Sequence, residues 1–342
     1  MSGRFDTHLR ARVLGVASYL PAAVRTSSEV EEIVADSSPD LIFPRGIVEL
    51  MTGVRHRRVA DEGVDASDLA AAAATRLLHK LAYKASDVDL LIFASASQDM
   101  LEPATANMVQ EKVGTSCPVF DVKNACNSFL NGLDVAASLI AVGNARSALV
   151  TSGEVPSRSI KWAVEDRDDF KLSFPGYTLG DAGAAALLVP ADGERGIFHT
   201  GFQTVSRYWK VATIPGGGSA HPRGDEFTYF RSDGTVLRDA FAEAGDGIVR
   251  EAFAATGTCY SDYKRILVHQ VAMPFLRNFT DFTGCPCEKI EVTLPELGNI
   301  ASATLPVGFS LAEERGTIAP GDNVMWIGLA SGISLGVLCM RY

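Results

Sequence analysis

Short runs of apolar residues, separated by helical segments, recur along the whole chain. The strands expected over residues 13–17, 89–95 and 265–270 are centred on such runs. Strands without a polar face are typical of sheets that are covered on both sides. The order of strands and helices in residues 1–192 returns in residues 193–342. We therefore predict an α/β fold of two similar halves, with two sheets and a layer of helices between them.

Local patterns add detail to this expected fold. Residues 65–84 are rich in alanine and predict a long helix, with Ser67 as its N-cap. Residues 236–255 predict a second long helix, and residues 290–293 a short strand.

Composition and charge exclude several classes of protein. The net charge of −10 argues against a nucleic-acid partner, because phosphate binding needs an excess of Lys and Arg. No apolar run approaches the ~20 residues of a membrane-spanning helix. The first six residues lack the apolar core of a secretory signal, so a cytoplasmic location with reduced cysteines is expected. Cys285 and Cys287 form an isolated pair of thiols, so no metal site is expected.

Cys126 lies where an apolar strand near Val119 gives way to a helix that continues to about Gly143. The positive end of a helix favours an anion, so we expect this position to lower the pKa of the thiol. Taken alone, the pattern fits a nucleophile and a small buried packing residue equally well.

Two other polar positions follow predicted strands. His269 ends the strand over 265–270, and Asn299 lies in Gly298-Asn299-Ile300-Ala301-Ser302, ahead of a helix. Taken alone, His269 fits a hydrogen-bonded histidine of the core, and Asn299 fits an amide that caps the helix. Reactive residues of α/β folds gather at the carboxyl ends of parallel strands. Cys126, His269 and Asn299 all lie just past such ends.

Several motifs together resemble one family, the ketoacyl-ACP synthase III group of the thiolase superfamily. They are Asp121-Val122-Lys123-Asn124-Ala125-Cys126, His269-Gln270, Gly298-Asn299-Ile300-Ala301-Ser302, Gly328-Leu329-Ala330-Ser331-Gly332 and Gly180-Asp181-Ala182-Gly183. The resemblance implies a thiolase fold, a five-layer α-β-α-β-α sandwich, with the nucleophile in residues 1–192 and the His and Asn in residues 193–342. It also implies a homodimer in which the strand near Val119 pairs across the two-fold axis.

The same resemblance assigns roles to the site residues. Cys126 would take an acyl group from a thioester. His269 and Asn299 would donate hydrogen bonds to the thioester oxygen of a second substrate, and the backbone N–H groups of Cys126 and Ser331 would form an oxyanion hole. The family usually has Gly at the position of Ser331.

Glu102 departs from the synthase III pattern, which has an aromatic residue there. The run Leu101-Glu102-Pro103 is similar to that of OleA-type enzymes, which join two long acyl chains head to head. In those, this Glu acts across the dimer as the base on the α-carbon. The alternative is a solvent-facing carboxylate at a helix N-terminus.

The substrate entrance departs from the pattern as well. Ile47 and Met51 stand where acyl-CoA users of the family carry the Trp and Arg that sandwich adenine. Delivery by acyl carrier protein is therefore the more plausible route, with Arg55 and Arg277 facing the acidic carrier. The basic run over residues 55–58 fits a strand edge as well as a binding patch.

We therefore predict an acyltransferase that binds no cofactor and condenses acyl-CoA or acyl-ACP thioesters to a β-ketoacyl product. The attacking carbanion would form by loss of CO2 from a malonyl unit or by proton removal at Glu102. Two alternatives remain: acyl transfer to an alcohol or amine, and a non-catalytic partner subunit.

Overall fold

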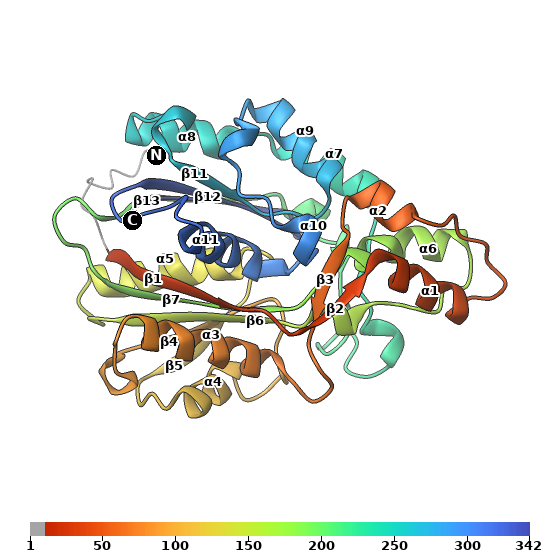
Figure 1. Cartoon of the computed structure of the whole chain (residues 1–342), viewed down its shortest axis with the longest axis horizontal. Coiled ribbons are helices and arrows are strands. Elements are labelled where there is room, and N and C mark those ends of the chain that lie inside the picture. Colours follow the sequence, from red (N-terminus) through yellow and green to blue (C-terminus); the bar gives the residue numbers. More distant parts are fainter. Residues whose placement is uncertain (1–10) are drawn as a thin grey trace.

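A computed structural model describes residues 11–342 of the chain. Residues 1–10, on which the expected lack of a secretory signal rests, lie outside the described part. The chain forms two stacked sheets with helices between them and on both outer faces (Figure 1). The predicted five-layer α-β-α-β-α arrangement is confirmed.

The first sheet has the strand order β1-β7-β6-β4-β5. β4 runs parallel to β5 and β6, whereas β7 is antiparallel to both β1 and β6. The strands are β1 (Ala11–Tyr19), β4 (Leu91–Ala94), β5 (Val119–Val122), β6 (Ala148–Glu154) and β7 (Ala182–Pro190). β5 is an edge strand with one neighbour among the described residues, which leaves its other side open for pairing.

The second sheet has the order β11-β12-β13-β8, with β11 parallel to β12 and the other pairs antiparallel. Its strands are β8 (Gly196–Thr204), β11 (Arg265–Val268), β12 (Asn323–Ala330) and β13 (Ser334–Arg341). All strands of the first sheet precede all strands of the second. The division that we propose at residue 192 falls between β7 and β8.

Helices fill three layers around these sheets (Figure 1). α5 (Ser128–Ala141) and α11 (Thr304–Glu314) lie between the sheets, where Trp326 of β12 packs against Phe129 of α5 and Phe309 of α11. α3 (Ala66–Lys80) and α4 (Thr105–Val113) cover the first sheet. α8 (Gly247–Thr256) and α9 (Met273–Thr283) cover the second. The central layer is almost wholly apolar, as the sequence of its helices predicts.

A lobe beside the sandwich packs around Tyr177. It consists of α1 (Ser27–Ser37), α2 (Ile47–Thr52), α6 (Arg167–Ser173) and the hairpin β2 (Ala23–Thr26) and β3 (His56–Val59). The remaining regular elements are α7 (Gly234–Ala244), α10 (Leu294–Leu297), β9 (Ala212–Thr213) and β10 (Arg231–Ser232).

Three local expectations were wrong. The helix expected over residues 236–255 is two helices, α7 and α8, because Gly245 adopts φ +72° and breaks it. The N-cap of α3 is Asp65 and not Ser67, because Asp65 and Asp68 form a capping box that starts the helix at Ala66. Residues 290–293 form no strand; Ile290 makes a single parallel bridge to Ile266.

No helix within residues 11–342 combines the length and the apolar character needed to cross a bilayer. Nor do those residues contain a cluster of three or more His, Cys, Asp or Glu side chains suited to a metal ion.

Candidate active site

Cys126 lies in the connection between β5 and α5, two residues before the first helical residue. Ala125 before it has φ +46°, a backbone conformation that residues with a Cβ seldom adopt. Ser128 secures this turn: its hydroxyl donates to the Ala125 carbonyl at 2.7 Å and accepts from the Asn124 N–H at 2.8 Å. The turn holds the sulfur at the carboxyl end of β5.

Two side chains tie this connection to the second half of the molecule. The Asn124 amide nitrogen donates to the Ser334 hydroxyl at 3.1 Å. The Asn127 amide nitrogen donates to the Ser334 carbonyl at 2.9 Å. Gly328 of β12 makes room for Asn127, because a Cβ at Gly328 would lie 1.9 Å from the Asn127 amide oxygen. The glycine of the closing motif therefore allows the connection that carries Cys126 to pack on β12.

His269 follows β11 and lies beside the same part of β12. Its N–H donates to the Ile327 carbonyl at 3.0 Å, one residue before Gly328. The side chain is buried, yet neither ring nitrogen has a hydrogen-bond partner among the described residues. Buried polar groups without partners are rare in folded proteins, so this imidazole is a strong candidate for binding a ligand.

Asn299 is held by the first half of the chain. Its N–H donates to the Thr178 carbonyl at 2.8 Å, and its carbonyl accepts from the Gly180 N–H at 3.1 Å. The side-chain oxygen accepts from the Ala301 N–H at 3.0 Å, which fixes the orientation of the amide. The amide nitrogen has no hydrogen-bond partner within residues 11–342.

Gly298 allows this approach of Asn299 to the first half. It has φ +67°, and a Cβ there would lie 2.3 Å from the Thr178 carbonyl oxygen. We expect Gly298→Ala to lower the free energy of unfolding by about 3 kcal/mol, from backbone strain and overpacking together. Gly316→Ala is the control, because Gly316 has φ +69° but open space around it, and should cost only about 1 kcal/mol. Urea unfolding measures both; equal losses would contradict the packing explanation.

The electrostatics of the site differ from the expectation for Cys126. Burial, and in second place the charge of Glu154, raise the pKa of the Cys126 thiol to about 12. The pKa of the thiol is therefore raised and not lowered as expected, since desolvation of the thiolate outweighs the hydrogen bond from the Cys126 N–H, which acts to lower it. Burial also lowers the pKa of His269 to about 4, which keeps the imidazole neutral at physiological pH.

The two expected oxyanion donors differ in their surroundings. The Ser331 N–H has no backbone acceptor among residues 11–342, whereas the Cys126 N–H interacts with the sulfur of its own residue. Ser331 lies in the turn between β12 and β13 and does not have positive φ, so this position does not require the family's usual glycine.

Glu102 lies in the loop between β4 and α4, and in the single chain it is exposed to solvent. Asp121 of the edge strand β5 anchors the end of this loop by accepting the N–H groups of Thr105 and Ala106, each at 2.9 Å. Met100 and Leu101, beside Glu102, are also exposed apolar side chains. Within residues 11–342, no hydrogen bond or ion pair joins Glu102 to Cys126, His269 or Asn299.

The two arginines expected at the entrance lie on neighbouring segments. Arg55 follows α2 and pairs with Glu296, and Arg277 is exposed on α9. α2 and α9 are in contact, with Met273 packed against Gly53 (Figure 1). Arg57 is buried and donates to Ser27 and the Tyr177 carbonyl, so much of the basic run over residues 55–58 has a structural role.

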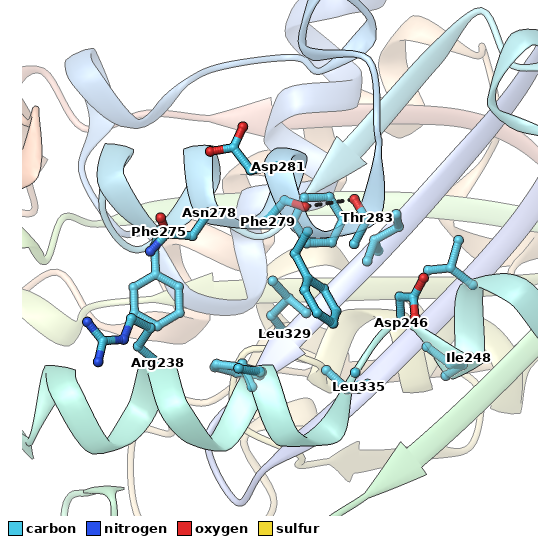
Figure 2. Close-up of a pocket in the computed structure, with 16 residues that line it drawn as sticks. Arg238, Asp246, Ile248, Phe275, Asn278, Phe279, Asp281, Thr283, Leu329 and Leu335 are labelled. Carbon is cyan, nitrogen blue, oxygen red and sulfur yellow. Dashed lines mark hydrogen bonds between the residues drawn. The ribbon is translucent and has the colours of Figure 1, made fainter.

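An apolar cavity of about 440 Å³ lies between α7, α9 and the outer face of β12 and β13 (Figure 2). A much smaller void beside His269 shares four lining residues with it, Phe241, Phe275, Phe279 and Leu329. These apolar side chains therefore line both the cavity and the void at the imidazole.

Sequence reasoning missed this cavity and the supporting residues Glu154, Asn127 and Ser334. The spacing of Phe275, Phe279 and Phe282 along one helix was a signal for an apolar groove. A carboxylate two residues after the apolar run over residues 148–152 was a signal for Glu154. The contacts of Asn127 and Ser334 join positions more than 200 residues apart, and no local pattern marks them.

The fold and the site define a thiolase-fold condensing enzyme, and comparisons with known proteins give its family. The model of 3-oxoacyl-[acyl-carrier-protein (ACP)] synthase III matches residues 120–206, and the model of its C-terminal part matches residues 253–342. The β-ketoacyl-[acyl-carrier-protein] synthase III of Methylococcus capsulatus is 31% identical over 97% of this chain and 99% of its own. That of Rhizorhabdus wittichii is 32% identical with the same coverage. The chain belongs to the β-ketoacyl-ACP synthase III family.

Solved structures extend this likeness to OleA. Cerulenin-bound OleA of Xanthomonas campestris superposes with a TM-score of 0.89 at 25% identity, over the whole of both chains. A cysteine-to-serine variant of that protein with bound lauric acid and lauroyl-CoA gives 0.87 at 25% identity, over 97% of this chain and 99% of its own. The chain is therefore a synthase III-like condensing enzyme with OleA-like features.

Proposed function

We propose that Cys126 is acylated by a thioester and that a second acyl or malonyl thioester then attacks this acyl group in a Claisen condensation. The thiol proton leaves as the sulfur attacks, and the coenzyme or carrier thiol is released. The carbanion of the second thioester attacks the acyl carbonyl carbon, which frees the sulfur and gives a β-ketoacyl thioester. The buried, unpartnered imidazole of His269 is the observation that carries this proposal.

His269 and Asn299 donate hydrogen bonds to the thioester oxygen of the attacking substrate, where negative charge develops. The neutral imidazole has one N–H for this purpose, and the Asn299 amide nitrogen is free. The N–H groups of Cys126 and Ser331 stabilise the oxyanion of the acyl group under attack. Acyl transfer without carbon–carbon bond formation, and a non-catalytic subunit, are not favoured, because the relatives are named as synthases.

The apolar cavity takes one of the acyl chains. Its lining is mainly apolar and shares four residues with the void at His269, and the OleA variant was solved with a bound fatty acid. Acyl-CoA and acyl carrier protein are both candidate donors. Exposed Leu50 and Met51 on α2, near Arg55 and Arg277, offer a mixed apolar and basic surface for an acidic carrier.

Ala242→Trp tests the cavity. Ala242 is an exposed residue of α7 that lines the cavity, so an indole there fills part of it without displacing the core. We expect turnover of a 12-carbon acyl thioester to fall at least about tenfold, while turnover of a 2-carbon thioester is kept. Ala255→Trp, on the exposed side of α8 and away from the cavity, is the control. Equal turnover of both chain lengths by Ala242→Trp would contradict the assignment.

A homodimer completes this proposal. β5 has an open edge with partly buried Val119, Phe120 and Val122, and the Glu102 loop is anchored to the same strand. Pairing of β5 with its copy brings each Glu102 toward the partner's site.

A cytoplasmic location is also proposed, in keeping with the six free cysteines.

Glu102→Ala separates the two routes to the carbanion. If Glu102 removes the α-proton, the variant loses at least about 10²-fold in condensation of two simple acyl thioesters, the usual worth of a general base. Condensation with a malonyl thioester needs no such base and is kept. The measurement is product formation from each substrate pair, with Cys126 acylation followed by intact-protein mass spectrometry. Equal activity of variant and wild type on simple acyl thioesters would exclude the proton-abstraction route.

A further inference from the structure

Glu154 is a fully buried carboxylate at the end of β6, in the middle of the first sheet. No Lys, Arg or His of the described residues forms an ion pair with it. The charge of Glu154 acts to raise the pKa of Lys123, but the Lys123 ammonium group donates its hydrogen bond to Gln98. A buried charge without an ion-pair partner is unfavourable unless hydrogen bonds replace its lost hydration, and at Glu154 they do.

The hydrogen bonds come from two loops that belong to different halves of the chain. The Ala96 N–H (2.8 Å) and the Ser97 N–H (3.1 Å) and hydroxyl (2.8 Å) donate to the carboxylate from the loop that carries Glu102. The Ser302 N–H (3.3 Å) and hydroxyl donate to it from the turn after Asn299. One carboxylate therefore joins the Glu102 loop to the Asn299 turn.

The bonds to Ser302 bear directly on Asn299. Ala301 has φ +46°, an unfavourable conformation for alanine, and its N–H is the group that orients the Asn299 amide. Ser302 follows at once, and the Glu154 carboxylate holds both its N–H and its hydroxyl. The strained turn is thus held by Glu154 on one side of Ala301, while the Ala301 N–H fixes the orientation of the Asn299 amide on the other.

A similar turn occurs in both halves. Ala125 and Ala301 both have φ +46°, and each is followed at once by a residue with a nucleophilic side chain, Cys126 or Ser302. In the first half that side chain is left free to react. In the second half the hydroxyl is bound to Glu154 and lies 2.9 Å from the Ser152 hydroxyl. Ser302 is therefore an anchor and not a second nucleophile.

We propose that Glu154 is a positioning residue, which holds the Asn299 amide and the Glu102 loop in register for the condensation step without touching the substrate. This inference rests on the proposed function. The charge of Glu154 also disfavours the Cys126 thiolate, so its removal does not slow the first acylation.

Glu154→Gln is the central test, because it keeps the shape and replaces one acceptor oxygen by an NH2 group that faces donors. We expect acylation of Cys126 by an acyl-CoA to stay within about threefold of wild type. Condensation should fall about 100-fold in kcat with little change in KM, the usual cost of a misplaced donor at a developing oxyanion. Ser302→Ala removes the hydroxyl bond to Glu154 and the contact with the Ser152 hydroxyl but keeps the Ser302 N–H bond, so it should lower condensation only about tenfold. Glu111→Gln, an exposed carboxylate of α4, is the matched control and should change neither step.

Rapid-quench mass spectrometry of Cys126 measures acylation, and product formation measures condensation. Condensation by Glu154→Gln at the wild-type rate overturns the proposal, and so does an equal loss of both steps. If Glu154→Gln does not fold, Ser302→Ala decides by the same two measurements. A wild-type enzyme that neither acylates Cys126 nor condenses would refute the proposed function itself, which is a different result.

Discussion

Cys126→Ala is expected to abolish the acyl adduct and to lower condensation by at least about 10⁴-fold, because it removes the atom that forms the covalent intermediate. The measurement is intact-protein mass after incubation with acyl-CoA and acyl-carrier thioesters of several lengths, followed by product analysis. The control is Cys287→Ala, which removes an exposed thiol far along the chain. An adduct that survives in Cys126→Ala would place the nucleophile elsewhere.

The raised pKa of Cys126 adds a pH signature to this prediction. Below its pKa a thiol gains about tenfold in thiolate for each pH unit. Since burial raises the pKa of Cys126 to about 12, its alkylation by iodoacetamide should keep rising between pH 7 and pH 10. A plateau near pH 7 would instead indicate a lowered pKa and would restore the expectation based on the helix N-terminus.

His269→Ala is expected to lower condensation by about 10²–10³-fold, or 3–4 kcal/mol, through loss of a hydrogen-bond donor to the developing negative charge. Acylation of Cys126 should be affected less, which single-turnover mass spectrometry can resolve. His79→Ala, an exposed residue of α3, is the control and should leave both steps unchanged.

The same residue makes stability depend on pH. Burial lowers the pKa of His269 to about 4, whereas an unfolded histidine titrates near 6.5. Above pH 6.5 both states are neutral and the group contributes nothing to the pH dependence. As the pH falls from 6.5 to 4, only the unfolded state takes up the proton, so folding loses up to about 3 kcal/mol. His269→Gln removes this loss, and urea unfolding of both proteins at pH 7 and pH 4.5 measures it. Parallel stability curves would contradict a buried neutral imidazole.

The layered α/β fold was predictable from the sequence because its strands are apolar on both faces. Such strands must be covered on both sides, and the repeated order of strands and helices in the two halves indicated two sheets with helices between them. The errors arose where a local sequence pattern was compatible with more than one start or end of a helix. Gly245 interrupts an otherwise continuous helical pattern, and the capping box of Asp65 and Asp68 starts α3 at Ala66, so that Ser67 lies inside the helix.

The candidate site was also predictable in part, because its residues follow the same apolar strands. Cys126, His269 and Asn299 each follow an apolar strand or a short loop, and motif order indicated their common role. Glu154 was not recognised, because its importance comes from donors at residues 96, 97 and 302 that only the folded chain brings together.

The sequence by itself determined which residue types stand at the strand ends and therefore the family and the chemistry open to it. Only the tertiary structure decided the protonation state of those residues and the groups that surround them. Desolvation and hydrogen bonding depend on which groups from distant segments surround a side chain. For that reason the thiol of Cys126 has a raised pKa where its position before a helix predicted a lowered one.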